Sequence, residues 1–235
     1  ALLYASVGFG GGSTYTALMI LFGVPLTLVP AISLLCNLVV VSGGSWRYAR
    51  AGITPWRRAA PMVLLAAPLA FLGGLTPVSE GVLVLLLSSS LLLAALLLLV
   101  PPRTQRAVAM PAPVIVAAAM GIGYLAGVVG IGGGIFLAPL LHLIRWAEAR
   151  AIAATASLFI LVNSLFGLGG QLVKGKGDGL IHALADYWPL LIAVAIGGTI
   201  GSLVGARIAQ PLIIRRLTAL LIAVVAVRLL WATLS

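Results

Sequence analysis

Charged residues are scarce in this sequence. Only 8% of its 235 residues are charged, whereas 62% are hydrophobic, and the mean hydropathy is +1.23. A soluble domain is typically about 25% charged and about 45–50% apolar. So few charges cannot cover a globular surface in water, which indicates that lipid surrounds most of the chain. Because a membrane span needs about 20 apolar residues, the length accommodates about eight spans with short connections.

Acidic residues are especially rare, since the chain has four of them. All four fall in or near predicted loops: Glu80, Glu148, Asp178 and Asp186. No predicted span therefore carries a carboxylate in its interior. This pattern argues against a proton pump or a cation channel, because both need intramembrane carboxylates.

Cysteine and histidine are also few, with one Cys and two His in the chain. The single cysteine, Cys36, excludes an intramolecular disulfide and a Cys-based structural zinc site. No segment holds paired carboxylates either, so no catalytic constellation assembles. We therefore expect no enzyme activity, no catalytic or metal-binding residues and no cofactor.

Basic residues outnumber the acidic ones, and the formal net charge is +10. They lie at the ends of apolar runs, which is typical of the positive-inside bias of membrane loops and not of nucleic-acid binding. With eight simple spans, loops 47–58, 101–113 and 173–183 share one side with both termini and hold eight Lys/Arg. The first half shows four basic residues against none, which places both termini in the cytoplasm.

The second half reverses this bias. The side opposite the termini holds five arginines there: Arg145, Arg150, Arg207, Arg215 and Arg216. One explanation is that the two halves are inverted, because a glycine-broken segment turns back without crossing the membrane. The other is that Arg215 and Arg216 lie within a helix that lines the interior. Both explanations remain open from sequence.

Apolar runs between Gly, Pro and charged residues define eight segments. They span about 1–22, 26–46, 59–75, 79–100, 114–144, 148–172, 184–208 and 211–233. The run 81–100 is uncharged and, apart from three serines at 88–90, apolar without alternation, whereas barrel strands alternate and are half as long. In lipid, only a helix satisfies every backbone group within one segment. The expected fold is therefore an all-α polytopic membrane protein.

The two halves of the chain repeat each other. Val-Gly-Phe-Gly-Gly-Gly at 7–12 matches Val-Gly-Ile-Gly-Gly-Gly at 129–134, an offset of 122 residues. Further matches follow in the same order at offsets of 124 to 126: Ser33-Leu34 with Ser157-Leu158, Asn37 with Asn163, Gly43-Gly44 with Gly169-Gly170, and Gly73-Gly74 with Gly197-Gly198. We expect a first four-segment repeat at 1–100, a linker at 101–113 and a second four-segment repeat at 114–235.

Each half carries a triple glycine inside an apolar segment. A glycine costs about 0.8–1 kcal/mol relative to alanine in a helix interior. A helix broken there exposes the N–H groups and the positive dipole end of its second part, which together suit an anion. Paired broken helices at matching positions in two halves are the best sequence indication of a transporter site. Close helix packing through small residues is the alternative.

The candidate substrate-binding residues lie at the breaks and on the segments that follow them. Backbone N–H donors are expected from Gly10, Gly11, Gly12, Ser13, Gly132, Gly133 and Gly134. Side chains that orient the anion are expected from Ser33, Asn37, Thr155, Ser157 and Asn163. Hydrogen bonds within or between helices are the alternative role for each side chain. The pairs Gly73-Gly74 and Gly197-Gly198 are assigned to helix packing.

At these residues the chain resembles the TauE/SafE family of sulfite and organosulfonate exporters. The resemblance rests on the two glycine blocks, on Leu137-Ala138-Pro139-Leu140 after the second block, and on Ala154-Thr155-Ala156-Ser157-Leu158. It covers nearly the whole chain. The first copy departs from the pattern, because Ser13-Thr14-Tyr15-Thr16 is more polar than usual and Ala17 replaces a proline. The resemblance implies transport of small sulfur-containing or carboxylate anions across a bacterial or archaeal inner membrane.

The function expected from these features is secondary transport by alternating access around a site between the repeats. Sulfite, sulfonates and sulfoacetate are the substrates considered. Export is favoured, because an anion leaving a negative cytoplasm gains about 2.3 kcal/mol per charge per 100 mV without a coupling ion. An anion-selective channel is the alternative. The expected partners are the anion and the lipid bilayer but no nucleic acid, and a homodimer is left open.

Overall fold

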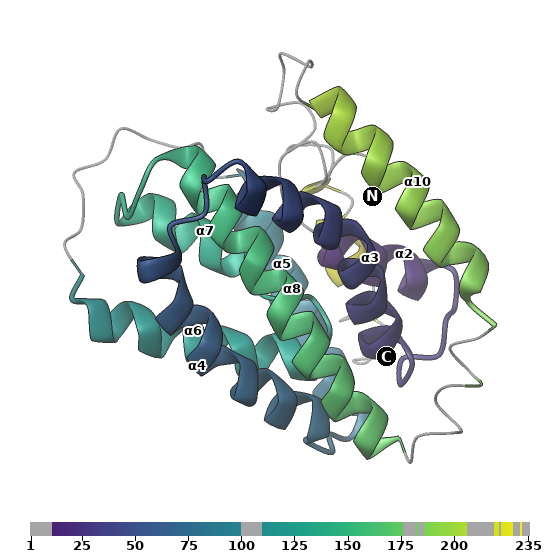
Figure 1. Cartoon of the computed structure of the whole chain (residues 1–235). Coiled ribbons are helices and arrows are strands. Elements are labelled where there is room, and N and C mark those ends of the chain that lie inside the picture. The colour runs from purple at the N-terminus through teal and green to yellow at the C-terminus, as the bar shows by residue number, and fades with distance from the viewer. Residues whose placement is uncertain are drawn as a thin grey trace.

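A computed structural model of the chain describes residues 11–99, 110–175, 182, 186–205, 219–220, 222–227 and 231. Within these residues the regular structure is entirely helical (Figure 1). The helices are α2 (Gly12–Leu21), α3 (Val29–Arg50), α4 (Trp56–Leu75), α5 (Glu80–Leu99), α6 (Ala112–Val129), α7 (Gly134–Leu143), α8 (Ala149–Lys174) and α10 (Trp188–Gly205). This confirms the all-α prediction.

Five of these helices are long and apolar enough to cross a membrane: Val29–Arg50, Trp56–Leu75, Glu80–Leu97, Ala112–Val129 and Ala149–Lys174. The helices α7 and, within its described residues, α10 are shorter apolar helices. The chain is thus a multi-pass membrane protein. The arrangement of eight segments in two repeats stays a prediction, because much of the first and last predicted segments lies outside the described residues.

The helix boundaries differ from the sequence map at the basic loop. Residues 47–58 were expected to form a loop, but α3 continues to Arg50 and α4 already begins at Trp56. Arg47 and Arg50 therefore stand in the last turn of α3, where positive charge interacts favourably with the helix dipole. The turn between the two helices is short, and it ends at Pro55, just before α4.

Glycines let α4 pack directly against α6 and α8. A Cβ atom on Gly127 of α6 would overlap the carbonyl oxygen of Ala70, and one on Gly73 would overlap that of Tyr124. On the other side, a Cβ on Gly74 would overlap the carbonyl oxygen of Gly167 in α8. Gly123 meets Ala66 and Gly127 meets Ala70, while Gly167 meets Ala70 and Gly170 meets Gly74. Residue numbers rise together along both helix pairs, so α4, α6 and α8 run parallel. These contacts agree with the packing role assigned to Gly73 and Gly74.

The helix α3 runs in the opposite direction to α8. Leu34, near the start of α3, lies against Gly167 near the end of α8, whereas Ser45 near the end of α3 bonds to Ser157 near the start of α8. The helix α10 lies along the outer side of α3, with Gly198 against Val40 (Figure 1).

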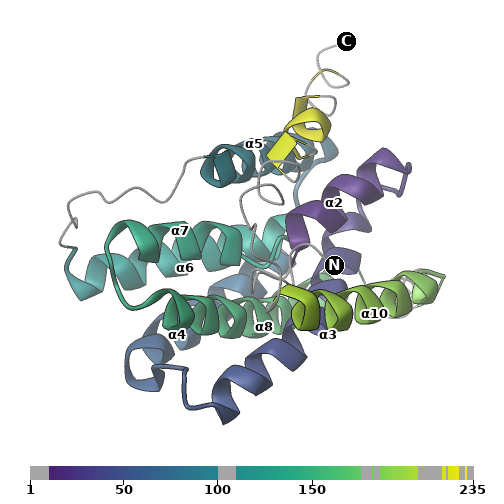
Figure 2. The same cartoon turned by 90° about the horizontal axis from the view of Figure 1, so that it is seen from above.

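The segment 114–144 does not cross the membrane as one helix. The helix α6 ends at Val129, and the backbone then takes positive φ angles at Gly130 (82°), Gly132 (78°) and Gly133 (76°). Glycine adopts this left-handed region without the Cβ clash that other residues meet. The chain turns back on itself here, and α7 returns along α6 (Figure 2). The predicted break at 132–134 is confirmed.

The return of α7 changes the assignment of two arginines. With eight simple spans, Arg145 and Arg150 were expected on the side opposite the 47–58 loop. The Arg58 guanidinium instead lies over the Trp146 ring, 4.5 Å from its centre, so both turns are at the same end of the bundle. The expected opposite placement of these two residues is therefore wrong, and the cause is that α7 turns back.

The short helices α2 and α7 have the same local geometry. Each is 10 residues long, they begin 122 residues apart, and a glycine with positive φ precedes each, Gly11 at 85° and Gly133 at 76°. Both end in the same way, because Gly23 and Arg145 also have positive φ angles, 76° and 49°. The matching bonds Val24 N–H to Met19 O and Trp146 N–H to Leu141 O are both 2.9 Å long.

The helices that the repeat predicts to correspond run in opposite directions. Figure 2 shows α2 and α7 leading away from a common centre, and α3 is antiparallel to α8. The helix α10, the predicted counterpart of α4, runs along α3 in the same direction and so opposes α4. Of the two explanations left open by the charge pattern, these directions favour the inverted arrangement.

Candidate functional site

The N-terminal ends of α2 and α7 carry no capping side chain. Gly11 and Gly133 occupy the N-cap positions, and neither helix has a side-chain hydrogen bond there. Backbone N–H groups in the first turn of a helix have no partner within the helix. The aligned peptide dipoles also place about half a positive charge at each end. Both ends are therefore suited to a negatively charged group.

The two glycine breaks meet each other at one junction. A Cβ atom on Gly12 would overlap the carbonyl oxygen of Ile131, which belongs to the break before α7. The same atom would lie 2.8 Å from Nδ2 of Asn37. A Cβ on Gly132 would lie 2.8 Å from Asn37 Nδ2 and 3.2 Å from Ser164 Oγ. The Asn37 amide thus contacts both breaks, and no larger residue than glycine fits at either contact.

Several polar atoms at or near this junction are buried without a partner. Asn37 and Ser164 are both 0% exposed, and neither amide atom of Asn37 nor the Ser164 hydroxyl has a hydrogen-bond partner among the described residues. The same is true of Asn163, which precedes Ser164 on α8. A buried polar group left without a hydrogen bond costs about 1–3 kcal/mol. Such groups are characteristic of a place that receives a polar ligand or water.

Ser33 holds the start of α2 in place. Its hydroxyl donates a hydrogen bond of 3.2 Å to the carbonyl oxygen of Gly12, and the Thr16 hydroxyl donates to Ser33 Oγ at 3.2 Å. All three residues are buried. Ser33 therefore lies at the junction as expected, although its hydroxyl already donates to the backbone carbonyl of Gly12.

Two of the expected side chains lie elsewhere in the bundle. Thr155 is fully buried and donates to the carbonyl oxygen of Ala151 in its own helix, at 2.8 Å. Ser157 bonds to Ser45 of α3, with 2.9 Å between the two hydroxyl oxygens. Both residues follow the alternative role considered for them, a hydrogen bond within or between helices. Neither hydroxyl bonds to the Asn37 amide, which has no hydrogen-bond partner among the described residues.

The remaining expected residues line the two breaks. A Cβ on Gly11 would meet the Tyr15 ring, one on Gly133 would meet Phe159, and one on Gly134 would overlap the Ile160 side chain. Ser13 is buried in the first turn of α2. Gly10 lies outside the described residues.

The two asparagines that the repeat pairs do not have the same contacts to the starts of α2 and α7. Gly12 and Gly134 begin equivalent helices, and Gly12 contacts Asn37 whereas Gly134 contacts Ile160. Asn163 lies three residues after Ile160 in α8. The equivalence of Asn37 and Asn163 therefore stays a prediction.

Sequence reasoning missed Ser164 altogether. At the offsets of 124 to 126 that relate the second and sixth segments, its counterparts are the apolar Val40, Val39 and Leu38, so the comparison of the halves did not select it. The sequence feature that could have identified Ser164 is its position directly after Asn163 and seven residues before Gln171. Gln171 is also buried on α8 and donates to the carbonyl oxygen of Gly127 at 3.0 Å.

The fold defines a helical membrane protein in which glycines break the chain between α6 and α7, and the N-terminal end of α2 meets that break. Residues 1–229 match the family described as Sulfite exporter TauE/SafE, and the chain belongs to this family. Among the described residues no cluster of His, Cys, Asp and Glu could hold a metal ion. No solved structure matches the chain significantly.

Relatives of the chain are described as membrane transporters. "Probable membrane transporter protein y4hK" from Sinorhizobium fredii is 35% identical over 239 residues, which cover 98% of this chain and 94% of that protein. "Probable membrane transporter protein MamO" from Magnetospirillum gryphiswaldense is 23% identical over 88% of this chain, but the match spans 39% of MamO. The family and these relatives indicate a membrane transporter.

Proposed function

We propose that the chain is a secondary carrier that exports small oxyanions, such as sulfite, sulfonates or sulfoacetate, across the inner membrane. The observation that carries this proposal is the Asn37 amide, which is buried, lacks a partner among the described residues and touches the glycine breaks of both halves. The amide Nδ2 group and the N-terminal ends of α2 and α7 are all donors to negative charge.

The proposed site holds the anion without a countercharge. Neutral donors stabilise an oxyanion through charge-assisted hydrogen bonds, and among the described residues no buried polar side chain around the junction is charged. The substrate can then be released as readily as it binds. Ser164 and Asn163 extend the donor set, and the inverted halves rock around the junction to open it to either side in turn.

The direction follows from the membrane potential and the charge at the two ends. Six arginines lie at the end with the α3–α4 and α7–α8 turns, so the positive-inside rule places that end in the cytoplasm. An anion leaving through the junction gains about 2.3 kcal/mol per charge per 100 mV. The prediction that both termini are cytoplasmic concerns residues outside those described.

The test is anion counterflow in proteoliposomes with Asn37→Leu, Asn37→Ala and Asn163→Ala. A hydrogen bond to a charged group contributes about 1.5–3 kcal/mol. Loss of the Asn37 amide should therefore weaken anion affinity by about 10- to 150-fold. Because this amide has no protein partner among the described residues, Asn37→Leu should leave the melting temperature unchanged or raise it.

The matched control is Cys36→Ala, which changes the buried neighbour of Asn37 on the side packed against apolar residues of α2 and α10. It should retain anion affinity. Full transport by all three asparagine variants would show that the site is misassigned. No movement of any small sulfite, sulfonate or carboxylate by the unmodified protein would reject the carrier, and single-channel currents would replace it with the channel.

A further inference from the structure

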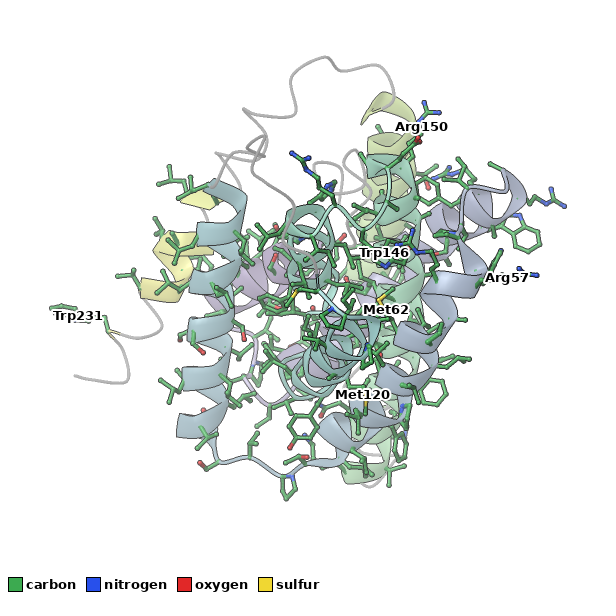
Figure 3. All side chains as sticks on the ribbon, turned by 90° about the vertical axis from the view of Figure 1, so that its left-hand side faces the viewer. Arg57, Met62, Met120, Trp146, Arg150 and Trp231 are labelled. Carbon is green, nitrogen blue, oxygen red and sulfur yellow. The ribbon has the colours of Figure 1, made fainter. Side chains whose placement is uncertain are left out.

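Two basic turns from different halves of the chain lie together at one end of the bundle. The α3–α4 turn is flanked by Arg47, Arg50, Arg57 and Arg58, and the α7–α8 turn carries Arg145 and Arg150. They meet where Arg58 covers the ring of Trp146 at 4.5 Å. Figure 3 shows Arg57, Trp146 and Arg150 in the right half of the view. We name this surface the basic turn pair.

The basic turn pair is exposed and strongly positive. All six arginines are exposed, and the one carboxylate on these turns is Glu148. At the opposite end of the bundle, the described helix ends carry Lys174 and the acidic residues Glu80 and Asp186. Among the described residues, six of the seven basic side chains therefore lie at this end, with Glu148 as the one acid beside them.

Exposed tryptophans place this surface at the membrane boundary. Trp46 is 61% exposed and Trp56 is 52% exposed, and they stand at the end of α3 and the start of α4. The Arg50 guanidinium lies 4.8 Å from the centre of the Trp46 ring. Tryptophan is enriched where the hydrocarbon meets the headgroups, because its ring is apolar and its N–H is polar. Arginine at the same depth reaches the lipid phosphates.

We propose that the basic turn pair is a binding site for the phosphate headgroup of an anionic phospholipid. Arg57 and Arg58 bind the headgroup from one turn, and Arg145 and Arg150 from the other. Trp146, which is 8% exposed, fixes the Arg58 side chain between the two turns. A planar guanidinium forms two parallel hydrogen bonds with a phosphate, whereas a lysine ammonium cannot pair in this bidentate way. The proposal is independent of the transported substrate.

The test uses the tryptophans at the site as reporters. Trp188→Phe and Trp231→Phe leave Trp46, Trp56 and Trp146, which all belong to this end. The protein is reconstituted in vesicles of phosphatidylcholine with either brominated phosphatidylglycerol or brominated phosphatidylcholine, whose bromines quench nearby tryptophan fluorescence. Stronger quenching by the anionic lipid, at equal content, is the expected result.

Arg57→Gln and Arg57→Gln/Arg58→Gln should lower that preference by about fivefold for each arginine removed. Arg57→Gln keeps the Arg58–Trp146 contact, so it reports on headgroup binding even if the double variant is unstable. The control is Lys174→Gln at the opposite end, which should leave the preference unchanged. Equal quenching by both lipids, or a preference that neither arginine variant reduces, would overturn the proposal. So would an equal loss in Lys174→Gln.

Discussion

The contact between α4 and α6 leads to a sharp prediction for Gly127→Ala. A Cβ atom there would overlap the carbonyl oxygen of Ala70 and lie 2.9 Å from the backbone nitrogen of Gly74. Both obstacles are backbone atoms, so no side chain can rotate away. Ordinary van der Waals contact begins near 3.4 Å, and α4 and α6 must therefore separate by on the order of 1 Å.

The expected loss of stability follows from two opposing terms. Overpacking a well-packed contact costs about 1–3 kcal/mol, and a backbone clash belongs at the upper end of that range. Alanine recovers about 1 kcal/mol of helix propensity relative to glycine. The net destabilisation is about 2 kcal/mol, which corresponds to about 4–8 °C in melting temperature for a chain of this length. Separation of the helices also weakens the bond from Gln171 to Gly127.

Gly121→Ala on the same helix is the matched control, because nothing lies within 4 Å of a Cβ at that position. It gains the same helix propensity without a clash, so it should melt at the temperature of the unmodified protein or above it. The assay is thermal unfolding of the detergent-solubilised protein, followed by fluorescence-detected size-exclusion chromatography. Equal melting temperatures for the two variants would refute the tight α4–α6 contact.

Three further outcomes are expected. Arg145→Gly should raise the melting temperature. Arg145 has a φ of 49°, and this left-handed backbone costs a residue with a Cβ about 1–2 kcal/mol that glycine avoids. A lower melting temperature would contradict that geometry. In a Cys36→Ala background, Ser45→Cys/Ser157→Cys should cross-link on oxidation, since the hydroxyl oxygens are 2.9 Å apart. If α3 moves against α8 during transport, the cross-link should block counterflow, and a reductant should restore it. Full activity of the cross-linked protein would exclude that movement. Thr155→Val should keep full anion affinity, because the Thr155 hydroxyl already donates to the carbonyl oxygen of Ala151. A weaker affinity would mean that this hydroxyl contacts the anion.

The sequence predicted the class of fold and the place of the second break, because composition and glycine runs act locally. Left-handed φ angles at Gly130, Gly132 and Gly133 follow directly from a residue without a Cβ. The direction of the chain after the break could not be predicted in the same way. It depends on the packing of α7 along α6 and α8, which no local pattern encodes. The reversed charge bias of the second half was the available indication.

The candidate site was predicted unevenly for a similar reason. Asn37, Gly12 and Gly132 were selected from their types and their place near the breaks, and the structure brings them into contact. Thr155 and Ser157 have the same chemistry, but whether a hydroxyl is already bonded depends on neighbours such as Ala151 and Ser45. Whether any of these residues binds an anion stays a prediction.

The opposed short helices also determine the shape of the electric field around the junction. The helices α2 and α7 are equally long and point away from a shared centre (Figure 2), so their dipoles largely cancel at a distance. What remains is a quadrupole, with the two positive ends adjoining and the negative ends about 15 Å away along each helix. Such a field falls off more steeply than that of a single dipole. Attraction of negative charge is therefore confined to the junction, and the membrane voltage does little net work on the helix pair when both move together.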